Sequence, residues 1–76
     1  MNVIMEDIPI KLKTQKGNLE LVIEKDLDEV GYYLYVFRNG ECINDYLQDT
    51  LILAKEFARD KFGVLENNWT PFNNSG

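Results

Sequence analysis

Hydrophobic and polar residues alternate along the first third of the chain, which is the pattern of β-strands with one buried face. One alternating stretch spans residues 8–14 and a second spans residues 19–25. A two-residue loop at residues 16–17 would join them and pair Leu12 with Leu21, so that apolar side chains share one face. The pattern predicts an antiparallel hairpin.

A run that is apolar on both faces, residues 31–38, follows an acidic connection. It ends at Asn39-Gly40, the strongest short-range signal for a tight hairpin turn. The chain returns through residues 41–45, and the register set by the turn places Val36 beside Ile43. These residues predict the third and fourth strands of a meander.

Apolar residues then recur at helical spacing, which predicts a helix over about residues 46–62. Two residues compete as its N-cap, Asp45 and Asp49, and Gly63 stands where a helix stops. The stripe expected to cover one face of the sheet contains Leu47, Leu51, Ala54, Ala58, Phe62 and Leu65.

A flank of this helix, at Leu53 and Phe57, needs a further cover. The candidate within the chain is the part of the tail (residues 64–76) that runs from Val64 to Phe72, through Trp69, and the candidate outside it is a partner chain. The expected fold is α+β. It is a single domain over residues 1–76, with a four-stranded antiparallel meander, one C-terminal helix on one face and an ordered aromatic tail.

Composition narrows the class of protein. The 76 residues are 45% hydrophobic and 28% charged, as in globular domains, and the formal net charge is −5. This charge disfavours nucleic acid and anionic membranes as partners and favours a basic protein surface. Because the start of the chain lacks a cationic leader and no apolar stretch reaches membrane-spanning length, we expect a cytoplasmic protein.

Catalytic and metal-binding chemistry finds little support in the residues. Histidine is absent, and Cys42, the only cysteine, neighbours Glu41 without a base to activate it. The acidic stretch from Asp26 resembles half of a calcium loop, but Val30 and Phe37 occupy ligand positions. We therefore expect neither an enzyme nor a cofactor nor a metal site.

The alternation within residues 31–38 puts three aromatic side chains on one side of that strand. If the helix covers the other side, these aromatics form an exposed interaction patch, or else the tail caps them as core; both readings stay open. An acidic rim beside such a patch would steer a basic partner. The candidate partner-binding residues are Asp26, Asp28, Glu29, Tyr33, Tyr35 and Phe37.

The middle of the chain resembles the core domain of HicB-type antitoxins. The resemblance rests on the segments Leu21-Val22-Ile23-Glu24-Lys25-Asp26, Gly31-Tyr32-Tyr33, Cys42 and Asp49-Thr50-Leu51, with Ala54 and Ala58. A short hairpin replaces the proline-rich turn usual before the family's cysteine, and no DNA-binding domain follows the helix. The resemblance implies a related sheet-and-helix scaffold that binds and masks a small toxin.

These observations predict a small acidic interaction protein without enzymatic activity. The leading hypothesis is an inhibitor of the antitoxin or immunity type that occludes a basic protein partner. The alternative is a small self-associating structural or regulatory protein, whose surplus apolar surface forms a homodimer.

Overall fold

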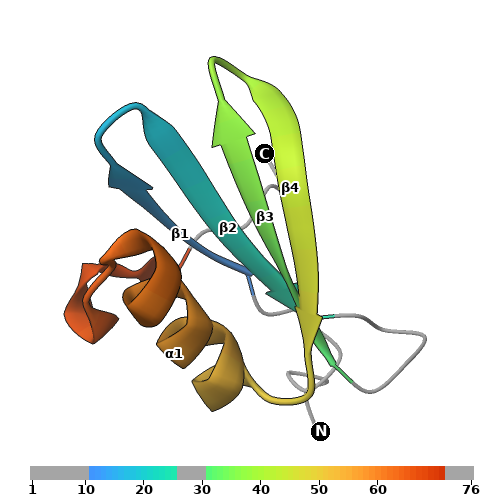
Figure 1. Ribbon diagram of the computed structural model, residues 1–76. Helices are drawn as coiled ribbons and strands as arrows, with labels where there is room; N and C mark the ends of the chain where they lie inside the picture. The colour runs from blue at the N-terminus through green and yellow to red at the C-terminus, as the bar shows by residue number, and fades with distance from the viewer. Residues whose placement is uncertain (1–10, 26–30, 72–76) are drawn as a thin grey trace, which may run out of the picture.

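The computed structural model describes residues 11–25 and 31–71, which form an antiparallel sheet with one helix on one of its faces (Figure 1). The fold is therefore α+β, as predicted. The five strands lie in the order β4-β3-β2-β1-β5. Their bounds are Lys11–Lys16 for β1, Leu19–Lys25 for β2, Tyr32–Arg38 for β3, Glu41–Gln48 for β4 and Thr70–Pro71 for β5. Helix α1 spans Leu51–Phe62, and a short 3-10 helix, η2, spans Glu66–Asn68.

The first hairpin turns one residue later than predicted, and its two strands pair in a register shifted by two residues. Its loop is Gly17-Asn18, and Leu12 pairs with Ile23 instead of Leu21. Gly17 has φ 61°, and a glycine with positive φ at the first loop position is typical of a type II′ turn. A register shift of two residues leaves every side chain on its predicted face, because side chains alternate with period two.

The second hairpin turns at Asn39-Gly40, as predicted, with φ 54° and 82°. Two consecutive positive φ angles are those of a type I′ turn. The predicted pair of Val36 with Ile43 is wrong, because a bulge shifts the register and Val36 pairs with Asn44. Ile43 is the extra residue. Because of it, the side chains that follow on β4 take the opposite face from the one that a regular strand would give them.

The helix begins later than predicted, because β4 continues to Gln48. Thr50 is the N-cap, and its hydroxyl oxygen accepts a hydrogen bond from the Leu53 N–H at 3.1 Å. Neither Asp45 nor Asp49 has this role. The predicted stop at Gly63 is confirmed, since this residue has φ 77° and its N–H donates to the Arg59 carbonyl at 3.0 Å.

The core lies between the sheet and α1. Trp69 is only 8% exposed, so this part of the tail is ordered and packs within the chain, as one of the two alternatives expected. The helix is not the last element, because β5 follows it and pairs with β1. The described residues thus form a sheet of five strands and not four. The buried hydrophobic residues of the described ranges are Leu21, Ile23, Leu34, Val36, Ala54, Ala58, Val64 and Trp69.

The flank of α1 is covered differently from the expectation. The ring of Tyr46, from β4, lies 4.6 Å from that of Phe57, while Leu53 stays 42% exposed. Leu47 and Leu65, two members of the expected helical stripe, are exposed and lie outside α1. The bulge explains the positions of Tyr46 and Leu47, since it turns Tyr46 toward the helix and Leu47 toward the opposite face.

Candidate protein-interaction surface

The sheet face opposite α1 carries a row of three aromatic side chains, Tyr33, Tyr35 and Phe37, hereafter the aromatic face. Because side chains alternate along β3, Leu34 and Val36 enter the core while the aromatics point the other way. The rings of Tyr33 and Tyr35 are stacked, with centroids 5.6 Å apart and planes at 19°. The ring of Phe37 follows at 6.5 Å from Tyr35 and is tilted by 48°. All three side chains are half-buried.

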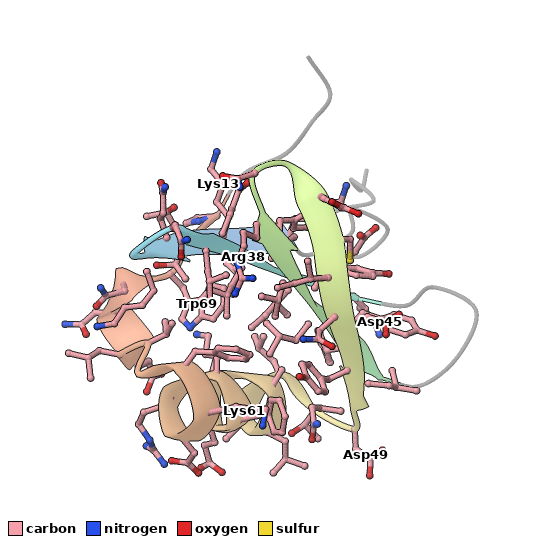
Figure 2. All side chains as sticks on the ribbon, turned by 45° about the horizontal axis from the view of Figure 1, so that its top comes forward. Lys13, Arg38, Asp45, Asp49, Lys61 and Trp69 are labelled. Atoms are coloured by element: carbon pink, nitrogen blue, oxygen red, sulfur yellow. The ribbon has the colours of Figure 1, made fainter. Side chains whose placement is uncertain are left out.

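The described part of the tail does not lie over this face. Trp69 packs on the α1 side of the sheet (Figure 2), and β5 continues along the outer edge of β1. Residues 64–71 therefore do not cap the aromatic row. This favours the interpretation of the row as an exposed patch over its interpretation as a core that the tail covers. Phe72 lies outside the described residues.

Neighbouring strands frame the aromatic face with mixed side chains. From β2, Glu24 is paired with Tyr33, Val22 with Tyr35 and Glu20 with Phe37. From β4 the corresponding residues are Leu47, Asp45 and Cys42. The amine of Lys11 on β1 lies 3.8 Å from the carboxylate of Glu24. The result is an apolar stripe on β3 with charged residues on both sides, the arrangement of an apolar interface core with a polar rim.

The contribution of Leu47 and Asp45 could not be read from the sequence. Leu47 fits the helical stripe as well as it fits a strand, and only the bulge at Ile43 decides which face it takes. The general signal for a bulge is weak, because no glycine or proline marks this position.

The three acidic candidates, Asp26, Asp28 and Glu29, lie outside the described residues. The sequence nevertheless shows how the charge is distributed, since the described ranges contain eight basic and eight acidic side chains. The whole excess of negative charge belongs to Glu6, Asp7, Asp26, Asp28 and Glu29. The described residues are thus neutral overall, and the acidic excess is confined to two short stretches of sequence.

Among residues 11–25 and 31–71, no three His, Cys, Asp or Glu side chains gather as metal ligands would. Cys42 is exposed, and its thiol donates to the Asn44 carbonyl at 3.4 Å. None of the helices in the described ranges has the length and hydrophobicity needed to cross a membrane.

No protein-family model, curated protein or solved structure matches this chain. The likeness to HicB-type antitoxins thus stays a prediction, and the function is argued from the surface itself.

Proposed function

We propose that this chain is a cytoplasmic protein-binding domain of the antitoxin or immunity type, which occludes a basic protein partner and performs no chemistry of its own. The observation that carries the proposal is the aromatic face. Three neighbouring aromatic rings lie on a sheet face that α1 leaves uncovered, and none of them belongs to the core on the other face.

Aromatic side chains suit this role because they bury a large apolar area and lose little conformational entropy on binding. Tyrosine in particular also offers a hydroxyl at the edge of an apolar contact. The stacking of Tyr33 on Tyr35 supports the proposal further, since rings already held in place need less ordering when a partner arrives.

The charge of the chain indicates the kind of partner. A net charge of −5 attracts a basic surface and accelerates its encounter, while it repels nucleic acid. An inhibitor that covers the basic, nucleic-acid-binding surface of a toxin would need this combination of acidic charge and apolar contact.

A second candidate, self-association, rests on a different surface. Ile52 is 67% exposed and Leu53 is 42% exposed on the outer side of α1, and Leu65 is 59% exposed close by in the sequence. A symmetric dimer would bury these side chains. Sedimentation over a wide range of protein concentrations separates this candidate from a monomeric inhibitor.

The proposed function is tested by co-expression with the product of the neighbouring reading frame. We expect that product to be basic, to arrest growth when expressed alone, and to be tolerated when this chain is present. The variant Tyr35→Ala should lose the protection, while the matched variant Ile52→Ala on α1 should keep it. A neighbouring product that neither arrests growth nor binds this chain would contradict the proposal.

A further inference from the structure

Strand β4 forms an edge of the sheet, and within the described ranges no strand pairs with its outer side (Figure 1). Six of its eight residues are exposed. The opposite edge is treated differently, because β5 pairs with Leu12 and Lys13 of β1. Strand β1 also carries lysines at positions 11, 13 and 16, and lysine is a common device against unwanted strand pairing. Among the described residues, one edge of the sheet is therefore protected and the other is open.

The open edge has a charge of one sign. Residues 41–50 contain Glu41, Asp45 and Asp49 and no lysine or arginine, although the described residues as a whole are balanced. All three acids are exposed, and Figure 2 shows Asp45 beside β4 and Asp49 where the strand ends. A chain that pairs with this edge meets negative charge along its length, so basic side chains would favour the pairing.

The backbone of β4 can accept such a strand. A Cβ built on Gly31, just before β3, would lie 3.1 Å from the Gln48 carbonyl oxygen, which therefore faces the β3 side. Backbone groups of successive residues in an antiparallel strand face alternate sides. Gln48 and Tyr46 thus direct their N–H and C=O groups toward β3, and Asp45 and Leu47 direct theirs outward.

We propose that β4 binds an extended, lysine- or arginine-containing segment of a protein partner as an added strand of the sheet. The inference rests on the proposed function and specifies how the partner is held. Backbone hydrogen bonds to Asp45 and Leu47 give affinity, and alternate side chains give specificity. Side chains on one face of the added strand lie beside Asp45 and Leu47 and continue the aromatic face. Those on the other face lie beside Tyr46, next to Phe57.

A second copy of this chain fits the open edge less well. Two β4 strands paired with each other would bring their acidic residues together, which is destabilising when like charges lie opposite one another. The lysine-bearing edge of a second copy is in turn partly covered by β5. The charge of β4 therefore favours a basic segment from another protein.

The test uses a blocked octapeptide of alternating lysine and valine with the isotope-labelled full chain in NMR titrations. We expect saturable shifts along Glu41–Gln48 and amide exchange at Asp45 and Leu47 slowed by about tenfold or more at saturation. An octapeptide of alternating glutamate and valine should bind at least about tenfold more weakly at low salt. The lysine peptide N-methylated at alternate residues should not bind, because it cannot form the backbone ladder.

Two variants of the chain complete the test. Leu47→Pro removes an outward N–H, which an edge strand tolerates, and should abolish binding; Asp45→Asn keeps the backbone and should only weaken it. Equal binding of the glutamate or N-methylated peptide, or no binding of the lysine peptide, would overturn the inference. So would protection of β4 amides that depends on the concentration of the chain alone, which indicates a second copy. If the neighbouring gene product binds Leu47→Pro normally but fails to bind Tyr35→Ala, the edge inference falls while the proposed function stands.

Discussion

The ring centroids of Tyr46 on β4 and Phe57 on α1 lie 4.6 Å apart, so an aromatic pair joins an edge strand to the helix. Phe62 adds a second contact, at 6.4 Å from Tyr46. The pair exists because the bulge at Ile43 turns Tyr46 to the helix side of the sheet. The same bulge places Asp45 and Leu47 beside the aromatic face, so a single extra residue links the packing of the helix to the composition of the candidate interface.

Deletion of Ile43 together with Asn44 tests this link. Without these two residues, Asp45 would follow Cys42 and pair with Val36, so Tyr46 would turn away from Phe57 and Leu47 would turn into the core side. We expect the free energy of unfolding to fall by about 2 kcal/mol or more, since an aromatic contact is lost and the strand is repacked. Denaturation with urea measures the change. Ile43→Ala keeps the bulge and should cost less than about 1 kcal/mol, because this side chain is 38% exposed.

The N-cap of α1 gives a matched pair of variants. Thr50→Ala removes the hydroxyl that accepts from the Leu53 N–H and should lower stability by about 1 kcal/mol. Asp49→Ala, one residue earlier, should change it by less than about 0.5 kcal/mol. The melting temperatures of the two variants, measured side by side, check the assignment; a larger loss for Asp49→Ala would mean that the cap lies there instead.

Trp69 gives a test of how the tail is held. Its Nε1 is buried and has no hydrogen-bond partner among the described residues. Trp69→Phe removes this unsatisfied donor along with some volume, and should cost much less than Trp69→Ala, for which we expect about 3–5 kcal/mol. Truncation after Leu65 should also lower the melting temperature. Full stability of the truncated chain as a monomer would contradict the docking of the tail.

The acidic stretches are tested through kinetics. Neutralising Asp26, Asp28 and Glu29 together, to Asn and Gln, should slow association with the basic partner by about tenfold at low salt and weaken its salt dependence. The melting temperature should change little. Stopped-flow measurements at several salt concentrations are the check, with Glu56→Gln on α1 as the control. An unchanged association rate would assign the steering to another part of the chain.

The sequence predicted which side chains share a face more reliably than it predicted register. Leu21 shares a face with Ile23, and Leu34 shares a face with Val36, as alternation predicted, and all four are buried. Alternation alone left open which face of the sheet the helix covers. The loop at Gly17-Asn18 was misplaced because a shift of two in the register preserves both faces, and hydrophobic pattern cannot detect it.

The structure of the segment between Asn44 and Thr50 could not be predicted, for two physical reasons. Tyr46 and Leu47 satisfy either a strand or the first turn of a helix, and Asp45, Asp49 and Thr50 are all good cap residues. The choice depends on the bulge and on the contact of Tyr46 with Phe57, which is a tertiary interaction. For the candidate site, alternation placed Tyr33, Tyr35 and Phe37 together on one face, but the β4 residues beside them escaped prediction for the same reasons.

The most direct test of the central claim, that the aromatic face is the surface that binds the partner, is the dissociation rate of Tyr35→Ala from the neighbouring gene product. We expect dissociation at least about tenfold faster than for the unmodified chain, with an association rate changed by less than about threefold, because truncation of a central aromatic contact acts mainly on complex lifetime. Ile52→Ala should dissociate at the unmodified rate. An unchanged dissociation rate for Tyr35→Ala, in a variant that remains folded, would contradict the account and move the interface to another surface.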